Sequence, residues 1–267
     1  MSRRSLIVVG VGIRAGVDTT PEARELIRGA DKVLHVVGDP LAAAWIEGLN
    51  PTAESLATMY IGGATREEIY AAMVDKIMVC VRRTRQLCVA FYGHPGVFCY
   101  VAHEAMRLAR LENVIVRMVP AISAVDWLFA DLGVDPGAQG CQSYEATTFL
   151  LCGCRFDPYA ALLLWQIGAI GDPGWPCSAN SQCLELLTEY LKPHYGPHHE
   201  VVIYEAAWDP VSDPSITRLP LAELPQAHTT LGSTLFVPPR GPLRIDPQVI
   251  KKLDQKVLAL LTSRSLK

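Results

Sequence analysis

The run LCVAFYGHPGVF, residues 87–98, shows the organisation of the chain most clearly. Leu87–Phe91 is a short apolar segment, which predicts a buried strand. A loop with two glycines and a proline follows at once, so its backbone is bare and its shape is restricted. With Tyr92 and Phe98 as apolar faces, such a loop suits a flat heterocycle or a small zwitterion at the carboxyl end of a sheet. His94 either donates a hydrogen bond there or is a turn histidine bonded to the backbone.

The segments on either side of this run alternate between strand and helix. Thr20 and Pro21 predict a helix start, with Thr20 as N-cap and proline at the first helical position. Short apolar strands that alternate with amphipathic helices predict an α/β fold with a mainly parallel sheet. The other expected strands are Leu6–Val9, Lys32–Val37 and Val114–Val119, and the other expected helices are Leu41–Leu49, Thr65 to about Arg85, and His103–Arg110.

A second α/β unit is expected after Pro120. Its predicted segments are a helix at Ala124–Leu132, apolar segments at Thr148–Cys152 and Ala161–Gly168, a loop at Gly171–Ser178, a helix at Ser181–Leu191, and strands at Glu200–Tyr204 and Thr234–Val237. The tail, Pro247–Lys267, has the pattern of an amphipathic basic helix. The predicted organisation is therefore an N-terminal subdomain over residues 1–120, a C-terminal subdomain over 121–241 and a helix within 242–267.

Composition excludes several classes of protein. The 267 residues are 50% hydrophobic and 19% charged, which gives ample core for one large or two modest domains. A net charge of −3 and a pI near 6.2 argue against nucleic acid or an acidic membrane as partner. The apolar start carries two glycines and no small-residue cleavage site, so a buried strand fits better than a secretory signal. The eight cysteines never have CxxC spacing, which predicts free thiols in a reducing cytoplasm and no metal site.

The first glycine motif, Gly10-Val11-Gly12-Ile13-Arg14-Ala15, matches a degenerate dinucleotide fingerprint. That fingerprint works only when a helix N-terminus follows the strand directly and its amides meet a pyrophosphate. Here the best helix start is Thr20, about ten residues beyond the strand. The glycines are therefore expected to allow a sharp turn or the close approach of a ligand to the backbone.

A second motif, MYIGGATREEIY at residues 59–70, combines a helix start with a group of polar aromatic residues. Thr65 and Glu68 form a capping-box pattern after a Gly-Gly bend. Arg66 and Tyr70 are four residues apart and share one face of the first turn, over which the bend can fold Tyr60. By itself the motif fits a capped surface helix with a stacked Arg–Tyr pair.

The motifs in their order resemble the tetrapyrrole methylase superfamily. They are VVGVG near the start, AD before the second strand, FYGHPGVF, and MVPAISAVDWLFADL. The resemblance covers nearly all of residues 5–240. It implies two α/β subdomains with S-adenosylmethionine bound in the cleft between them.

Within that superfamily the chain is most similar to the borosin peptide α-N-methyltransferases. The segments that carry this likeness are DPLAAAWI, MYIGGATREEIY, FYGHPGVF, SAVDWLFADLGVDP, the QSYEAT run, WQIG and the STLFVPP strand. Such enzymes methylate backbone amide nitrogens of a ribosomal peptide (a RiPP). On the family pattern, Tyr60, Arg66 and Tyr70 correspond to the catalytic residues.

This chemistry suits two phenols and a guanidinium. A peptide nitrogen is a poor nucleophile because its lone pair is delocalised into the carbonyl. Arg66 can favour an ionised Tyr70 or steady an imidate oxygen as the N–H proton leaves. Tyr60 can share the proton or hold the substrate carbonyl, and the sequence does not say which tyrosine is the base.

The resemblance also implies a set of cofactor-binding residues. Val97 and Ala206 equally fit ordinary core positions, and Ser233 fits the start of a strand. The implied set is Tyr92, His94, Val97, Phe98, Ser123, Ala124, Gln166, Tyr204, Ala206, Ser233 and Thr234.

The chain departs from the fused borosin enzymes, which carry their substrate at their own C-terminus. It stops soon after Pro238-Pro239, so we expect a split system in which a separate precursor peptide is methylated in trans, with a truncated chain or another acceptor as the alternatives. The resemblance implies a cytoplasmic homodimer, either alone or in a heterotetramer with two precursor chains. Carbon methylation of a porphyrinoid and a non-catalytic peptide-binding protein are the alternative functions.

Overall fold

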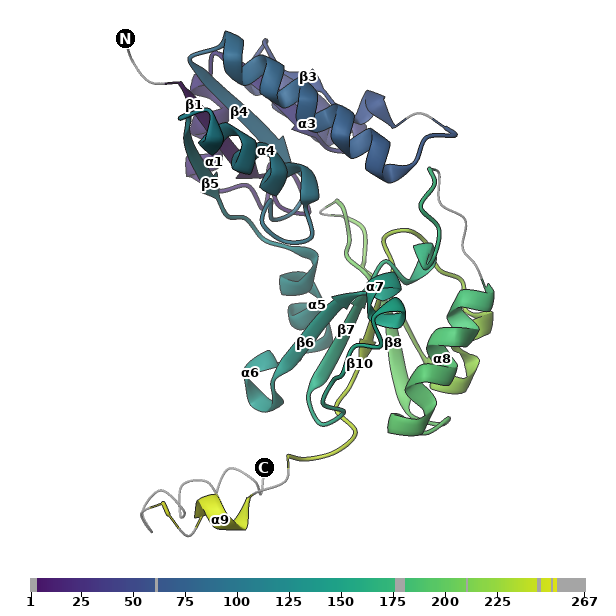
Figure 1. The fold of residues 1–267 in the computed structure, drawn as a ribbon. Coiled ribbons are helices and arrows are strands. Elements are labelled where there is room, and N and C mark those ends of the chain that lie inside the picture. Colours follow the sequence, from purple (N-terminus) through teal and green to yellow (C-terminus); the bar gives the residue numbers. More distant parts are fainter. Residues whose placement is uncertain are drawn as a thin grey trace.

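The computed structural model describes residues 4–60, 62–175, 181–209, 211–243, 246–250 and 252–253. It contains two five-stranded sheets, which Figure 1 shows one above the other. The N-terminal unit runs from β1 (Ser5–Gly10) to β5 (Ile115–Val119), and the C-terminal unit runs from α5 (Ala124–Leu132) to β10 (Thr234–Val237). The predicted α/β fold with two α/β units is confirmed.

The first sheet is parallel throughout, and its strand order is β3-β2-β4-β1-β5. Parallel neighbours need crossover connections, and helices supply them. Between β1 and β5 the elements are α1 (Pro21–Gly29), β2 (Lys32–Val36), α2 (Pro40–Leu49), β3 (Glu54–Ser55), the 3-10 helix η1 (Ala57–Met59), α3 (Arg66–Arg83), β4 (Gln86–Phe91) and α4 (Tyr100–Leu111).

Alternating side chains of β1 belong to two hydrophobic layers, one on each face of the first sheet. Leu6 and Val8 pack on the face covered by α3 and α4. Ile7 and Val9 pack on the opposite face, which α1 and α2 cover. Because both faces are covered, the central strands β1 and β4 are almost wholly buried apolar runs. Each fully buried aliphatic side chain contributes about 1.5–3 kcal/mol.

The two helix starts predicted from capping residues are confirmed by their caps. The Thr20 hydroxyl accepts a hydrogen bond from the Ala23 amide at 3.1 Å, and Pro21 is the first residue of α1. Thr65 and Glu68 form both bonds of the capping box at the start of α3. These caps satisfy amides that lack a partner within the helix and contribute about 1 kcal/mol each.

The second sheet is mixed, with strand order β6-β7-β10-β8-β9, and only the β6–β7 pair is parallel. One face packs against the helices α7 (Ala146–Leu151) and α8 (Ser181–Tyr195), and the other packs against α5. Between α5 and β10 the elements are α6 (Pro136–Gln139), β6 (Cys141–Glu145), α7 (Ala146–Leu151), β7 (Ala161–Trp165), the 3-10 helix η2 (Ile167–Ala169), α8 (Ser181–Tyr195), β8 (Glu200–Glu205), β9 (Ser215–Pro220) and the 3-10 helix η3 (Leu221–Gln226).

Of the predicted C-terminal helix, α9 (Pro247–Ile250) is observed, and the rest lies outside the described residues apart from 252–253. In Figure 1, α9 lies away from both sheets. No helix in the described part of the chain is long and apolar enough to cross a membrane. The seven described cysteines are all free thiols.

Asp18 connects the two units. Its carboxylate accepts hydrogen bonds from the Arg14 guanidinium at 3.0 and 3.2 Å and from the Trp127 indole of α5 at 2.9 Å. The Arg14 guanidinium also lies 3.8 Å from the centre of the Trp127 ring. Since the Asp18 side chain is 2% exposed, this charge is paired within the protein.

Candidate active site

A large cavity lies at the carboxyl ends of β2 and β4 and is lined on the other side by the C-terminal unit. Its volume is about 1650 Å³, compared with roughly 300–1000 Å³ for an ordinary small-molecule site. Open α/β sheets bind ligands at the carboxyl ends of their strands, and the first sheet borders this cavity at such ends. The space is therefore large enough for two reactants.

The two glycine loops beside this cavity are bonded to each other. Gly12 and Gly93 form an antiparallel bridge in which the Gly93 amide donates to the Gly12 carbonyl at 2.9 Å. A Cβ on Gly10 would lie 2.4 Å from the Gly93 carbonyl oxygen and 2.6 Å from the Ala121 Cβ. The first motif thus serves close backbone packing. Helix α1 starts only at Pro21, which agrees with the argument against a dinucleotide fingerprint.

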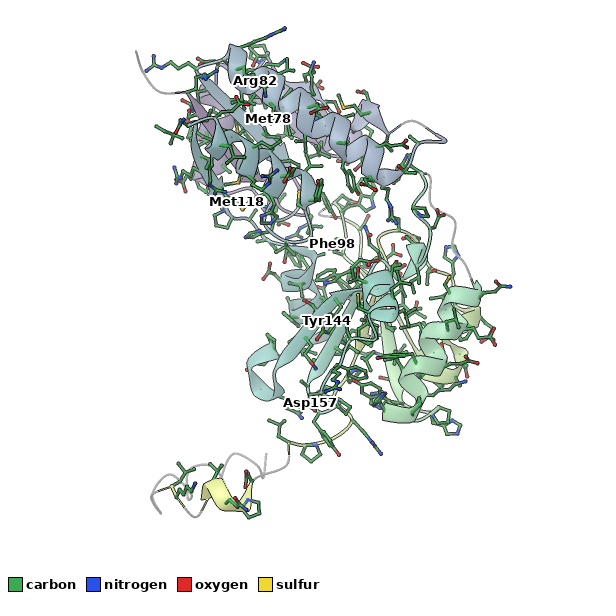
Figure 2. All side chains as sticks on the ribbon, in the orientation of Figure 1. Met78, Arg82, Phe98, Met118, Tyr144 and Asp157 are labelled. Carbon is green, nitrogen blue, oxygen red and sulfur yellow. The ribbon has the colours of Figure 1, made fainter. Side chains whose placement is uncertain are left out.

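The loop after β4 is held by two imidazoles at Gly96. The Gly96 amide donates to His94 Nδ1 at 2.9 Å, and His103 Nε2 lies 3.0 Å from the Gly96 carbonyl. This is the backbone-bonded turn histidine that the sequence left open, and the His94 ring also lines the cavity. Phe98 has a φ of +51°, a strained conformation for a bulky residue. Figure 2 shows Phe98 where the two units meet.

The start of α3 is bonded to the C-terminal unit. The Arg66 amide donates to the Pro173 carbonyl at 2.8 Å. The Arg66 guanidinium donates to Gln166 Oε1 at 3.3 Å and to the Asp172 carbonyl. Gln166 has a φ of +56°, so a second cavity residue is in the left-handed region. The cation predicted from the sequence is thus positioned by residues about 100 positions further along the chain.

Tyr60 and Tyr70 interact with each other in the same cavity. Burial raises the pKa of Tyr60 well above its usual value, and interaction and hydrogen bonding with Tyr70 add to the rise. The Arg66 cation opposes the rise, and it is the smallest contribution. The bend at the two glycines therefore brings Tyr60 to Tyr70, as the sequence predicted, and Tyr60 stays a neutral phenol over the physiological range.

Most of the predicted site residues line this one cavity. They are Tyr60, Arg66 and Tyr70, with Tyr92, His94, Val97, Phe98, Ser123, Ala124, Gln166 and Thr234. Ser123 and Thr234 are buried hydroxyl residues, and Ser123 is the N-cap of α5, where its hydroxyl donates to Asp126 at 2.7 Å.

Three predicted residues fall outside the described lining. The Tyr204 hydroxyl donates to Asp131 Oδ2 at 2.6 Å, and Ala206 packs against the same α5 layer. Ser233 is fully buried, donates to Glu205 and accepts from the Thr230 amide at 2.8 Å. These contacts hold the strand ends behind the cavity wall, and a role in binding a cofactor stays a prediction for all three.

The cavity also has aromatic walls that the sequence reasoning did not include. Trp175 packs on Tyr60 with 4.5 Å between ring centroids, and Tyr100 stacks with Tyr70 at 6.4 Å. Trp208 and Trp165 line the cavity as well. The only sequence signal for Trp175 was its place in a loop rich in proline and glycine, which is not specific to a site.

Cys99 also lines the cavity, beside the tyrosines. Burial raises the pKa of its thiol to about 11, so the thiol is protonated and a poor nucleophile. Among the described residues, no group of three or more histidine, cysteine or acidic side chains is placed to hold a metal ion. The phenols of Tyr60 and Tyr70 and the Arg66 guanidinium are therefore the candidate groups for proton chemistry. The histidine and the acidic residues of the lining accept hydrogen bonds from backbone amides; they are His94, Asp39, Glu145 and Asp172.

A family model described as Tetrapyrrole (Corrin/Porphyrin) Methylases matches residues 5–225. The chain belongs to this family. A solved member, the uroporphyrin-III C-methyltransferase of Thermus thermophilus complexed with S-adenyl homocysteine, has the same fold. It superposes with a TM-score of 0.59 and 18% identity over 88% of this chain and 98% of that one.

Two relatives are much more similar in sequence. The methyltransferase/ribosomally synthesized cyclic peptide dendrothelin A precursor of Dendrothele bispora is 36% identical over 255 residues. The methyltransferase/type I borosin cyclic peptide precursor of Serendipita vermifera subsp. bescii is 36% identical over 258 residues. Each match covers 94% of this chain, which spans only 61% and 62% of the length of these two relatives.

Proposed function

We propose that this tetrapyrrole methylase family member transfers methyl groups from S-adenosylmethionine to backbone amide nitrogens of a ribosomally made peptide. One observation carries the proposal: Tyr60, Arg66 and Tyr70 lie together in a cavity that both units line. The names of the two relatives, which join a methyltransferase to a cyclic peptide precursor, support the same substrate class.

The cavity residues fit the proposed cofactor, which supplies an electrophilic methyl group on a sulfonium. The side chains of Tyr92, Val97 and Phe98 offer apolar surface for an adenine ring, and the exposed fractions of Tyr92 and Phe98 are 48% and 53%. The buried residues Ser123 and Thr234 line the same space and offer hydroxyl groups for a ribose or an amino-acid moiety. Aromatic faces also attract a cation such as a sulfonium.

Tyr60, Tyr70 and Arg66 then have different roles in the proton transfer. Tyr60 stays protonated and donates to Tyr70, so Tyr70 reacts in its ionised form: the N–H bond of the substrate amide breaks, and the proton passes to the Tyr70 oxygen to give a neutral phenol. Arg66 is a permanent cation placed in the same cavity, where it stabilises negative charge on a phenol or on the carbonyl oxygen of the substrate amide. Its bonds to Gln166 and Asp172 fix its position before substrate binds.

A porphyrinoid substrate fits this lining less well. Such substrates are polyanions and require cationic walls. Among the described lining residues Arg66 is the only arginine or lysine, whereas Asp39, Glu145 and Asp172 are acidic. The balance of charge therefore favours a neutral acceptor such as a peptide amide.

The experiment is to incubate the protein with S-adenosylmethionine and two probes, a synthetic peptide of the dendrothelin A precursor core and the peptide encoded next to the gene of this chain. Tandem mass spectrometry is expected to show methyl units on backbone nitrogens of a probe peptide. Methylation of added uroporphyrinogen III on carbon, without peptide products, would overturn the proposal. Methylation of the enzyme alone would refute the predicted separate precursor. Sedimentation of the mixture tests the predicted homodimer and heterotetramer.

A further inference from the structure

The segment from Gly171 to Trp175, the cross-unit segment, lies across the start of α3. Gly63 donates to the Trp175 carbonyl at 3.2 Å, and Arg66 donates to the Pro173 carbonyl at 2.8 Å. Between these bonds Thr65 and Gly174 form an antiparallel bridge. A piece of the C-terminal unit thus pairs like a short strand with the residues that join Tyr60 to α3.

The conformation of the cross-unit segment is itself constrained. The Asp172 carboxylate accepts from the Gly174 amide at 2.8 Å, which closes a tight turn. The Gly171 amide donates to the Thr147 hydroxyl at 3.2 Å, and Gly171 has a φ of +73°. Trp175 therefore directly follows a turn whose conformation is fixed by these bonds.

Trp175 is the side chain that this segment adds to the site. Its ring lies 4.5 Å from the Tyr60 ring, centroid to centroid, with an interplanar angle of 41°. Both rings pack against the hydrophobic layer that contains Ile69 and Met73 of α3. An aromatic pair of this kind contributes about 0.5–1.5 kcal/mol beyond burial, and it fixes the direction of both rings.

This contact bears on the proton chemistry because Tyr60 is one of two coupled phenols. Burial is the largest cause of the raised pKa of Tyr60, and the Trp175 ring covers part of the Tyr60 ring. If Trp175 no longer covered the Tyr60 ring, water would reach the Tyr60 phenol. The pKa of Tyr60 would then fall, and Tyr60 would remain a neutral hydrogen-bond donor only up to a lower pH.

We propose that Trp175 is a positioning residue for the methyl transfer, which holds the Tyr60 ring in place and directs its hydroxyl at Tyr70. The proposal rests on the function proposed above, in which Tyr60 and Tyr70 handle the amide proton. The interaction of Tyr60 with Tyr70 then depends on how the C-terminal unit packs against the start of α3. Trp175 acts through Tyr60 and need not touch the substrate.

The test compares Trp175→Ala and Trp175→Phe with the parent enzyme in peptide methylation assays. Trp175→Ala is expected to lower kcat at least about tenfold while KM for S-adenosylmethionine changes less than about twofold. Trp175→Phe retains a ring and is expected to restore most of kcat. Trp45→Phe is a matched control, because Trp45 packs in the α1–α2 layer away from the cavity. Its kcat and pH profile are expected to equal those of the parent.

The pH profile separates positioning from general damage. In Trp175→Ala, kcat is expected to decline with rising pH at a lower pH than in the parent, because Tyr60 then ionises nearer the ordinary pKa of about 10. An equal pH profile in Trp175→Ala and the parent would overturn the proposal, even if kcat fell.

Phenolate absorbance in the near ultraviolet gives a readout that needs no activity. The difference between Trp175→Ala and the double variant with Tyr60→Phe isolates the titration of Tyr60, and the same difference is taken for the parent. The proposal requires this titration to occur at lower pH in the Trp175→Ala background. Unchanged titration would overturn it even in an active enzyme. A shifted titration in a protein that methylates no peptide would instead place the failure in the proposed function.

Discussion

Tyr60 and Tyr70 are the same residue type in one cavity, yet the structure gives them different surroundings. Tyr60 is covered by Trp175 on one side and bonded to Tyr70 on the other, and its pKa is raised. When the environments of two titratable groups differ in this way, their acid and base roles follow from the environments. In the proposed mechanism this leaves Tyr70, one helical turn from Arg66, as the group that accepts the proton.

Replacing Tyr70 with phenylalanine is expected to lower kcat for peptide methylation at least about 100-fold, the usual loss when a general base is removed. The ring and its stacking on Tyr100 remain, so we expect binding of S-adenosylhomocysteine and of the probe peptide within about twofold of the parent. Calorimetry measures the binding, and mass spectrometry measures the product.

Tyr144→Phe is the control for this variant. The Tyr144 hydroxyl makes only a long bond to the Arg155 carbonyl, at 3.4 Å, outside the cavity. Its activity is expected to equal that of the parent. If Tyr70→Phe retained full methylation, Tyr70 would not be the base, and a chain that binds peptide without methylating it in either form would fit the non-catalytic alternative.

The sequence predicted the residues of the α3 start but not what holds them. Thr65, Glu68 and the spacing of Arg66 and Tyr70 are local features, so a single segment reveals them. The partners of Arg66 are Gln166 and Asp172, which are 100 and 106 residues away in the chain. Contacts at that separation leave no periodicity or cap in the sequence, and for this reason Trp175 was missed as well.

At the scale of elements, the two glycine loops follow β1 and β4 and hold the ends of these strands together. The sequence left two readings for Gly10, a sharp turn or the approach of a ligand. The structure shows close contact with the protein itself, because a Cβ at Gly10 would lie 2.4 Å from the Gly93 carbonyl and 2.7 Å from the Pro95 Cδ. The shape of the cavity-lining loop thus depends on the absence of a side chain at Gly10, the last residue of β1.

Gly10→Ala is expected to destabilise the protein by about 1–3 kcal/mol, because backbone atoms of the Gly93 loop must move to admit the methyl group. Urea unfolding measures the change. Gly48→Ala is the matched control, since Gly48 is exposed in α2 and a Cβ there meets nothing within 4 Å. It is expected to stabilise the protein by about 0.5–1 kcal/mol. Equal effects of the two variants would contradict the packing role of Gly10.

The predicted elements that proved right are those with strong local signals. The continuous apolar runs of the first sheet, the capped helices, and α5 and β10 were all predicted within a few residues. Strands β3, β6 and β9 were missed. All three lie at sheet edges, and none contains a buried residue. An edge strand with polar residues on both faces lacks the alternation on which strand prediction depends.

At the scale of the whole molecule, the cavity exists only because two units are held together, and Figure 1 shows how little chain joins them. The cross-unit segment fixes one side of the junction at α3. The Asp18 cluster fixes the other side, where Arg14 and the Trp127 indole meet one buried carboxylate. The cross-unit segment contributes lining residues to the cavity, and Arg14 directly follows the lining residue Ile13, so both contacts lie close to the cavity.

Asp18→Asn tests this coupling. The amide keeps the shape of the side chain but removes the charge that faces the Arg14 guanidinium, whose side chain is itself only 22% exposed. We expect a loss of about 1–3 kcal/mol in the free energy of urea unfolding, since breaking a partly buried ion pair leaves an under-compensated cation. Hydrogen exchange is expected to increase at the start of α5, because the bond to the Trp127 indole weakens with the charge of its acceptor. Asp213→Asn removes an exposed carboxylate and controls for net charge. Equal unfolding of the two variants would show that Asp18 does not hold the units together, and the cross-unit segment would then be the contact that places Arg66 in the cavity.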